Sequence, residues 1–354
     1  MSSSRKIGVL TFHRCINYGS YWQARSLVEG LRRRGAEAVL LDHDSPRVNR
    51  AEWKCALRPL LPAPTPPTDH PLYARKARKF FQALAKLPRS PTFPLEQPGD
   101  METYDLVIVG SDEVWNLSHP WYGGLPLFFG DGLRTKRLAA YAASFGNYDA
   151  DAGLDHRWSA SIAAFAKVSV RDENSRRLIR QSTGFDPALV LDPCLQFGVP
   201  TETAGEERVL AVYGHSFPSW FQAAVRRIAA ERDLRVVSIG YRNDWADAQW
   251  LTAGPEDFAR FMASSAAVAT NFFHGCVFAI ANGKPLACAA SDYRRNKVTD
   301  LLALTRAERH LVSEATPKSE YRRLLAEPPR PEIGKSVAAL RRRSDAYIAD
   351  VLAA

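Results

Sequence analysis

Short apolar runs alternate along the chain with amphipathic segments of helical period. The run KIGVLTF at residues 6–12 predicts a strand, residues 20–35 predict a helix that ends at Gly35, and AEAVLLDHD at 36–44 predicts a second strand. A strand, a helix and a strand in this order require a parallel sheet, because the helix returns the chain to the edge where the first strand began. The pattern therefore predicts an α/β fold.

The same alternation continues in two series. In the first series the predicted strands are YDLVIVGSD at 104–112, RLAAYAASFG at 137–146, AKVSVRDE at 166–173 and ALVLDP at 188–193. A change of composition at VPTETAGEE, residues 199–207, predicts a linker. In the second series they are RVLAVYG at 208–214, RVVSIGY at 235–241, AAVAT at 266–270 and PLACAA at 285–290. We therefore predict two α/β domains in series, facing a cleft at the carboxyl ends of their strands.

A basic, proline-rich insertion at 46–95 interrupts the first series. It contains ten Lys/Arg and two acidic residues, which gives +8 of the net charge of +9, so the rest of the chain is nearly neutral. This distribution argues against a nucleic-acid partner. Within the insertion, residues 72–87 predict an amphipathic helix with apolar residues on one side and basic residues on the other. Such a helix fits an anionic membrane surface, or a lid that packs Phe80 and Phe81 on the first domain.

The remaining composition indicates a cytoplasmic protein. The five cysteines are scattered and form no Cys-x-x-Cys pair, so we expect neither a disulfide framework nor a zinc site. The N-terminus lacks the features of a signal peptide, and no run of about 18 apolar residues is present. Acidic residues do not cluster at metal-site spacing, so we expect no metal.

The strongest candidate site is ATNFFHGCVFAIANGKPLAC, at residues 269–288. A strand ends at Thr270, so His274 and Gly275 fall where the next helix begins. Free backbone N–H groups and the helix dipole favour anions there, histidine titrates near neutrality, and Gly275 would let a ligand approach the backbone. The alternative is an ordinary helix start with a polar residue in the turn.

Two motifs of the first domain also end strands. Asn17, Tyr18 and Gly19 form a turn that opens a helix, which suits an anion or is a plain turn. Ser111, Asp112, Trp115 and Asn116 follow another strand. Serine, aspartate and asparagine there suit sugar hydroxyls and the indole suits a pyranose face, whereas the alternative is a capped turn beside a core tryptophan.

Candidate cations follow two other strands. Arg171 ends the strand AKVSVRDE, where a guanidinium suits a carboxylate or phosphate or pairs with a neighbouring acid. Arg294, Arg295 and Lys297 precede a late helix and are candidates for holding an anion, or are simply solvated. The chain has no P-loop, no G-x-S-x-G elbow, no H-E-x-x-H and no G-x-G-x-x-G motif.

Taken in order, these segments resemble the polysaccharide pyruvyl transferase family. The matching text is KIGVLTFHRCINYGSYWQA, DLVIVGSDEVWN, YAASFG, SVRDENS, VLDP and ATNFFHGCVFAIANGKPL, between about residues 6 and 305. The resemblance implies two Rossmann-like domains of the GT-B type, with residues 1–198 on the acceptor side and 199–333 on the donor side. It also implies that the last helix, residues 334–354, packs back on the N-terminal domain.

The resemblance further implies phosphoenolpyruvate as co-substrate, no other cofactor, a pyruvate ketal and phosphate as products, and a saccharide acceptor that is often lipid-linked at the inner face of the membrane. The family's histidine and arginine fall on His274 and Arg171. Characterised members often carry an arginine at the position that Phe272 occupies here. Another cation must then hold the donor's anionic groups, and Arg294, Arg295 and Lys297 are the candidates.

Two other functions fit the same segments. A GT-B glycosyltransferase that uses a nucleotide sugar would share the architecture, and Asp292 is the one acidic candidate for its ribose. A sugar-phosphate binding protein without catalysis is the third interpretation, which Phe272 leaves open. The acceptor sugar, the bridged hydroxyls and the oligomeric state do not follow from the sequence.

Overall fold

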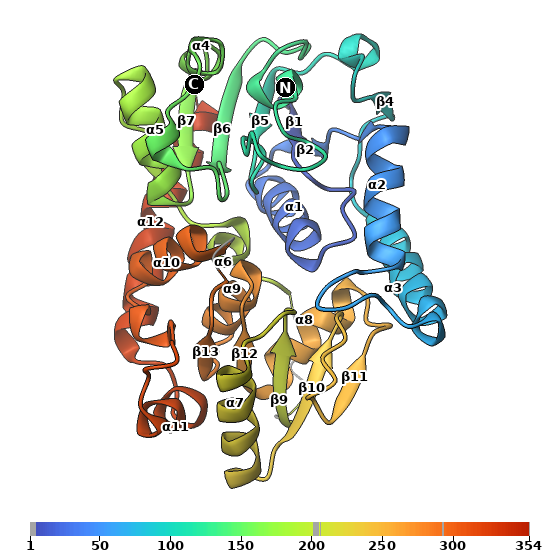
Figure 1. The fold of residues 1–354 in the computed structure, drawn as a ribbon. Helices are drawn as coiled ribbons and strands as arrows, with labels where there is room; N and C mark the ends of the chain where they lie inside the picture. The colour runs from blue at the N-terminus through green and yellow to red at the C-terminus, as the bar shows by residue number, and fades with distance from the viewer. Residues whose placement is uncertain (1–4, 201–204, 206, 292–293, 354) are drawn as a thin grey trace. The chain divides into compact units, whose positions relative to one another are not determined.

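The computed structural model describes residues 5–200, 205, 207–291 and 294–353 (Figure 1). The chain forms two compact units, each with its own core. Unit 1 comprises Met1–Trp53, Leu84–Gly198 and Ala339–Ala354, and unit 2 comprises Lys54–Ala83 and Val199–Ala338.

Unit 1 is built on a parallel sheet with the strand order β2-β1-β5-β6-β7-β8. Its strands are β1 (Lys6–Leu10), β2 (Glu37–Leu40), β5 (Leu106–Val109), β6 (Leu138–Ala143), β7 (Lys167–Val170) and β8 (Ala188–Leu189). The short strands β3 (His43–Asp44) and β4 (Phe93–Pro94) pair separately. The central strand β5 is buried along its whole length, as expected where helices cover both faces of a parallel sheet. The strand order reverses between β1 and β5, which makes the carboxyl ends of these strands a switch point.

Helices connect the strands of unit 1. They are α1 (Tyr18–Arg32), α2 (Pro46–Leu57), α4 (His156–Ala163), α5 (Glu173–Thr183) and α6 (Pro193–Phe197), with α2 running on into the residues of unit 2. Short 3-10 turns are η2 (Pro98–Asp100), η3 (Pro126–Phe129) and η4 (Ala150–Ala152). Aromatic and aliphatic side chains from β5, β6, β7 and these connections form one buried core.

Unit 2 is a second parallel sheet with the strand order β11-β10-β9-β12-β13. Its strands are β9 (Glu207–Tyr213), β10 (Arg235–Ile239), β11 (Ala248–Trp250), β12 (Ser265–Thr270) and β13 (Leu286–Cys288). Its helical segments are η1 (Pro67–Asp69), α3 (His70–Leu84), α7 (Ser219–Glu231), α8 (Pro255–Ser264), α9 (Phe273–Ala281), α10 (Arg295–Leu304), η6 (Glu308–His310) and α11 (Lys318–Ala326). The order reverses between β9 and β12. The two parallel sheets with their crossover helices confirm the predicted α/β fold with two Rossmann-like units.

The basic insertion is not assigned to a single domain as predicted. We assigned 46–95 to the N-terminal domain, but Lys54–Ala83 groups with unit 2. The predicted helix is α3, and its basic residues hold it to unit 2. Lys76 is buried and donates from Nζ to the carbonyl of Gly240 (2.9 Å), and Lys79 pairs with Asp257 (2.6 Å). Lys76 is therefore a buried contact within unit 2, whereas Lys79 forms its ion pair at the surface of the same unit.

The C-terminal helix α12 (Pro331–Ala353) packs on unit 1 with its later part, as predicted. Leu191 donates its backbone N–H to Ser344 Oγ (2.9 Å), and the hydroxyl of Tyr347 donates to the carbonyl of Ala140 (2.7 Å). Both side chains come from Ala339–Ala354, so this segment completes unit 1 across a large separation in sequence.

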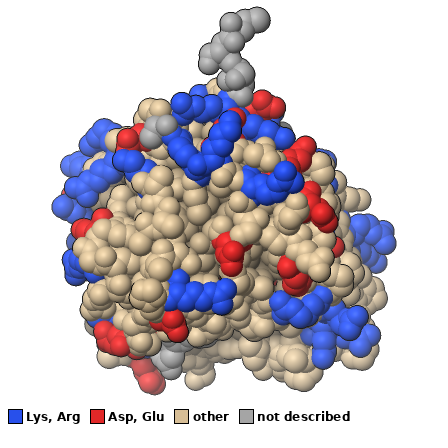
Figure 2. Space-filling view, turned by 90° about the horizontal axis from the view of Figure 1, so that it is seen from above, with Lys and Arg blue, Asp and Glu red and all other residues tan. Residues whose placement is uncertain are grey.

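Surface charge is mixed on the face shown in Figure 2, where acidic side chains lie among the basic ones and large areas are uncharged. Within the described residues, no helix combines the length and the apolar character that crossing a lipid bilayer requires.

Candidate functional site

In unit 1, the switch point carries the start of α1. Asn17 is the N-cap, and its side-chain oxygen accepts from the backbone N–H groups of Gly19 (2.8 Å) and Ser20 (3.3 Å). Tyr18, the first helical residue, is buried. The predicted turn is thus a capped helix start, in which the Asn17 side chain already satisfies two of the free N–H groups.

Beside α1, charged residues from three strand ends form a buried ion network. The guanidinium of Arg171, after β7, donates to Asp112 Oδ1 (3.0 Å) and to Asp192 Oδ2 (2.8 Å). All three residues are buried. Asp112 also accepts from the hydroxyl of Ser20 (2.8 Å), which ties the network to α1. Three of the motifs quoted above therefore meet through their charged side chains.

This network decides what Arg171 does. Burial by itself would lower the pKa of Arg171, but the carboxylates of Asp112 and Asp192 raise it above the ordinary arginine value, so the guanidinium stays charged. Because the guanidinium already donates to both carboxylates, Arg171 has a structural role that joins the strand ends of unit 1. Its role as an anion anchor stays a prediction.

The other candidates from the same strand end lie inside unit 1. Trp115 is fully buried in the core, and its indole N–H donates to the carbonyl of Phe128 (2.8 Å). Ser111 is buried and donates to the carbonyl of Ala142 (3.1 Å). Asn116 donates to Asn147 (2.9 Å) and is also buried. Their polar atoms support local structure, and the indole is a core side chain rather than a platform for a sugar ring.

In unit 2, His274 is the second residue of α9, which begins at Phe273 with Phe272 as its N-cap. His274 is 9% exposed, and its ring lies edge-on to that of Phe273 at 5.1 Å between centroids. The predicted helix start after a buried strand is therefore correct. It places His274 in the first turn, where the backbone N–H groups favour negative charge.

Gly275 has a reason of its own to be glycine. A Cβ at this position would lie 2.0 Å from Thr270 Oγ1. That oxygen is fixed, because it donates to the carbonyl of Tyr213 (2.6 Å) and accepts from the backbone N–H of Phe272 (3.0 Å). Glycine thus lets α9 begin directly against the ends of β9 and β12, which is a packing role in addition to any approach of a ligand.

Next to this helix start lies a group of side chains that we call the β9–β12 cluster. It consists of Tyr213, His215, Tyr241, Phe272 and Arg294. The guanidinium carbon of Arg294 lies 4.2 Å from the centre of the Phe272 ring. The Phe272 ring is edge-on to those of Tyr213, His215 and Tyr241, at 5.0, 5.2 and 5.3 Å. A cation thus rests on the ring of Phe272, at the position where the family resemblance led us to expect an arginine.

His215 is the cluster residue that the sequence analysis missed. Its Nδ1 lies 3.0 Å from the hydroxyl of Ser216, and its Nε2 lies 3.4 Å from Nη2 of Arg294. Since an arginine only donates, Nε2 accepts and the imidazole is neutral. Burial, together with the charge of Arg294, lowers the pKa of His215 to about 4. The signal was the Gly-His pair that ends the apolar run RVLAVYG.

The backbone that carries His215 is held from two sides. Asn271, after β12, donates to the carbonyl of His215 (2.7 Å), and Asn243 donates to the carbonyl of Gly214 (2.9 Å). Gly214 has a φ of 141°, and a Cβ there would lie 2.0 Å from Asn271 Oδ1. The switch point of unit 2 is therefore a fixed frame, which suits a site that must hold a ligand in one orientation.

Of the three cations predicted near the late helix, Arg294 alone has a described contact with the cluster. Arg295 is exposed at the first position of α10, and Lys297 is buried two residues later. Asp292, the residue considered for a nucleotide ribose, lies outside the described residues. The described contacts of unit 2 thus place the guanidinium of Arg294 beside the neutral imidazole of His215 and on the ring of Phe272, the N-cap of the helix that carries His274.

The comparisons with solved structures return distant likenesses over nearly the whole chain. The glycosyltransferase SnogD from Streptomyces nogalater shares 15% identity over 97% of this chain and 95% of its own, with a TM-score of 0.42. UGT89C1 from Arabidopsis thaliana, complexed with quercetin, shares 12% over 99% and 100%, with a TM-score of 0.48. S. aureus MnaA, in a co-structure with UDP, shares 15% over 96% and 90%, with a TM-score of 0.49.

No curated protein sequence matches the chain. A family model does: the model described as polysaccharide pyruvyl transferase matches residues 17–293. That span begins at the N-cap of α1 and reaches past β13, so it includes His274, Arg171 and the ends of β5 and β12.

Proposed function

The chain belongs to the polysaccharide pyruvyl transferase family, and we propose that it transfers the pyruvate unit of phosphoenolpyruvate to two hydroxyls of a saccharide. Family membership supports a transferase that acts in polysaccharide pyruvylation. The observation that carries the choice of donor is the β9–β12 cluster, where Arg294 rests on Phe272 beside a neutral His215. An oxygen-rich anion is the ligand that a guanidinium near a helix N-terminus favours.

The proposed reaction makes two C–O bonds and breaks one. The methylene carbon of phosphoenolpyruvate gains a proton and becomes a methyl group, which leaves an oxocarbenium-like carbon at C2. One acceptor hydroxyl adds to that carbon, the bond from C2 to the phosphate oxygen breaks, and a second hydroxyl closes the ketal. Two hydroxyl protons are released. One balances the proton gained by the methylene carbon, and the other leaves on hydrogen phosphate.

In this scheme the residues of unit 2 have separate roles in binding the donor and transferring the proton. Arg294 binds the carboxylate or phosphate of the donor, and His215 accepts from its Nη2 and so orients the guanidinium as a positioning residue. His274 carries the proton to the methylene carbon and helps to bind phosphate, because histidine both donates and accepts near neutral pH. No cofactor and no metal enters the scheme. Arg171 positions the strand ends of unit 1, which we assign to the acceptor.

Ligand-induced thermal stabilisation separates this function from its main alternative. We expect phosphoenolpyruvate to raise the melting temperature and UDP-glucose to leave it unchanged, since only ligands that bind the folded state stabilise it. The reverse result would support a glycosyltransferase and end the proposal. Release of inorganic phosphate from phosphoenolpyruvate that depends on added saccharide would exclude a protein that only binds sugar phosphates.

A second part of the proposal concerns where the acceptor is found. The exposed large apolar side chains of the described chain all lie in the basic insertion: Trp53, Leu60, Leu61 and Phe81. Arg75 and Arg78 are exposed in the same insertion, whereas Lys76 and Lys79 are engaged within unit 2. Exposed apolar and cationic side chains together suit an anionic lipid surface. We therefore propose a cytoplasmic protein that contacts the inner face of the membrane, with a lipid-linked saccharide as acceptor.

Vesicle sedimentation tests this contact. We expect the protein to bind vesicles of phosphatidylglycerol and phosphatidylcholine, and the Arg75→Glu/Arg78→Glu variant to bind at least about thirtyfold less, because each basic residue near the surface contributes about 1 kcal/mol. The Leu60→Ser/Leu61→Ser variant tests the apolar part. Arg322→Glu, at an exposed position of α11, is the control for net charge. Equal binding by all variants would rule out the insertion as the contact.

A further inference from the structure

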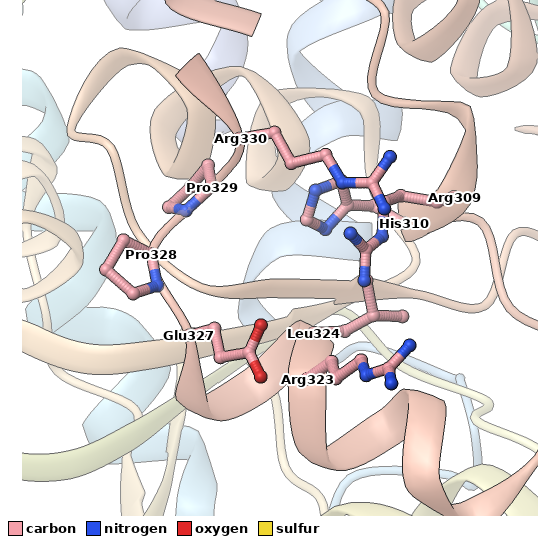
Figure 3. A pocket seen from close by; sticks show the side chains of 8 residues that line it. All are labelled: Arg309, His310, Arg323, Leu324, Glu327, Pro328, Pro329 and Arg330. Carbon is pink, nitrogen blue, oxygen red and sulfur yellow. The ribbon is translucent and has the colours of Figure 1, made fainter. Parts of the chain in front are cut away.

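Unit 2 holds a pocket that the proposed reaction does not use, and we call it the Arg330 pocket. It has a volume of about 230 Å³ and is lined by Arg309, His310, Arg323, Glu327, Pro329 and Arg330, among others (Figure 3). Its walls come from η6, from α11 and its C-terminal end, and from the residue before α12. At roughly 30 Å³ for a water molecule in the liquid, the space suits a small ligand.

The charges of this pocket are not balanced by its own acids. Arg309 donates from Nη2 to Glu320 Oε1 (2.8 Å), and Arg323 lies 3.8 Å from the other oxygen of the same carboxylate. One carboxylate thus serves two guanidiniums. Arg330 forms no ion pair with any carboxylate among the described residues, and Glu327 is the only acidic side chain in the wall. Three guanidiniums against two carboxylates leave an excess of positive charge.

A buried polar side chain forms the inner wall. His310 is 4% exposed, and its Nδ1 lies 2.7 Å from the carbonyl oxygen of Leu286. Because a carbonyl only accepts, Nδ1 carries the hydrogen of this bond, and the ring is fixed in orientation. In Figure 3 the side chains of Arg330 and Arg309 extend to the region of this ring. The pocket therefore combines a fixed imidazole with cationic side chains beside it.

The pocket is separate from the β9–β12 cluster. Leu286 is the first residue of β13, so His310 lies at the amino end of a strand whose carboxyl end is Cys288. The cluster lies after the carboxyl ends of β9 and β12. Since all these strands are parallel, the two places are at opposite edges of one sheet. A ligand of the Arg330 pocket is consequently not a reactant at the cluster.

We propose that the Arg330 pocket binds the phosphoryl group of a small phosphorylated metabolite. Guanidiniums from η6, α11 and the residue before α12 reach it from different directions, which suits a tetrahedral group with three terminal oxygens better than a planar carboxylate. Glu327, pointing into the same space in Figure 3, accepts from a hydroxyl of the ligand. The ligand contacts the residue before α12, the helix whose later part completes unit 1, so its binding stabilises the start of that helix. This proposal does not depend on the proposed function.

Isothermal titration with inorganic phosphate and with glucose 6-phosphate tests the site at constant chloride concentration. We expect both to bind, and Arg330→Gln and Arg323→Gln each to lower the affinity about tenfold, as loss of one charge-assisted contact does. Glu327→Gln should weaken glucose 6-phosphate and spare phosphate. Arg322→Gln is the matched control, because Arg322 adjoins Arg323 in sequence but pairs with Glu231 (2.8 Å).

The Arg294→Gln variant separates this site from the donor site. Phosphate binding that persists in Arg294→Gln and falls further with Arg330→Gln supports two sites. Binding that disappears with Arg294→Gln alone assigns all of it to the cluster and overturns the proposal. Equal loss in Arg322→Gln and Arg330→Gln shows general screening of charge and overturns it as well, as does the absence of binding at millimolar phosphate.

Discussion

The guanidinium of Arg294 stacks on the ring of Phe272, 4.2 Å from its centre. The two residues are far enough apart in sequence that no local pattern links them. The family resemblance led us to expect an arginine at position 272, and the structure instead places the guanidinium of Arg294, the N-cap of α10, on the ring of Phe272. Under the proposed function, this guanidinium supplies the positive charge that binds the donor, and the aromatic ring supports it.

The affinity for phosphoenolpyruvate should depend on both Arg294 and Phe272. Arg294→Gln is expected to weaken phosphoenolpyruvate binding about 10- to 100-fold, because a hydrogen bond to a charged group contributes about 1.5–3 kcal/mol. Phe272→Leu should weaken it several-fold by removing the support, whereas Phe272→Tyr retains an aromatic face. Calorimetric titration measures each affinity. The sharpest test is the double variant Phe272→Arg/Arg294→Gln, which moves the cation from position 294 to position 272. Recovery of phosphoenolpyruvate binding supports the view that a cation at either position serves the donor, and no recovery contradicts it.

His215 should make stability depend on pH. Its folded pKa of about 4 lies below the ordinary 6.5, so the neutral form is favoured in the folded state. Its contribution is complete above pH 6.5 and is lost as pH falls from 6.5 through 4, by at most about 3 kcal/mol. Urea unfolding at several pH values measures the slope.

His43 is buried with a pKa of about 3 and also makes stability fall at low pH. The effect of His215 is therefore measured as the difference between the parent and a His215 variant in how the free energy of unfolding changes with pH. His215→Gln should lose less stability than the parent between pH 7 and pH 5. If both proteins show the same slope, the imidazole of His215 is not held neutral by its surroundings.

Gly275 should tolerate no side chain. Gly275→Ala places a methyl group 2.0 Å from Thr270 Oγ1, and we expect a loss of about 1–3 kcal/mol in the free energy of unfolding. Gly334, an exposed residue in the first turn of α12, is the control, since nothing lies within 4 Å of a Cβ there. Gly334→Ala should leave stability unchanged or raise it by about 0.5–1 kcal/mol. Equal effects of the two substitutions would show that the contact with Thr270 is unimportant.

Loss of the Arg171 network should lower the free energy of unfolding, whatever its effect on turnover. Arg171→Met leaves Asp112 and Asp192 buried without their cation, and a broken buried pair costs about 3–5 kcal/mol. Arg176→Met, which removes a partly exposed pair with Asp186, should cost at most about 1 kcal/mol. Denaturant unfolding compares the two. An Arg171→Met protein of normal stability that cannot bind a substrate would restore the role of anion anchor.

The sequence by itself determined the alternation of strands and helices and the position of His274 at a helix start, whereas the return of the last helix was implied by the family resemblance alone. The first two features depend on periodicity and on turn residues that are local in the chain. The break near residue 200 was equally visible, because composition changes there.

Only the tertiary structure decided what the polar and aromatic side chains do. Trp115 and Arg171 both follow strands, but packing placed one in the core and the other between two carboxylates. His215 meets Arg294 across 79 residues, and Lys76 turned from a predicted surface cation into a buried contact. The residue type determines which interactions a side chain can make. Its burial and its neighbours determine which of these interactions it does make, and both arise only when segments distant in the sequence come together in the fold.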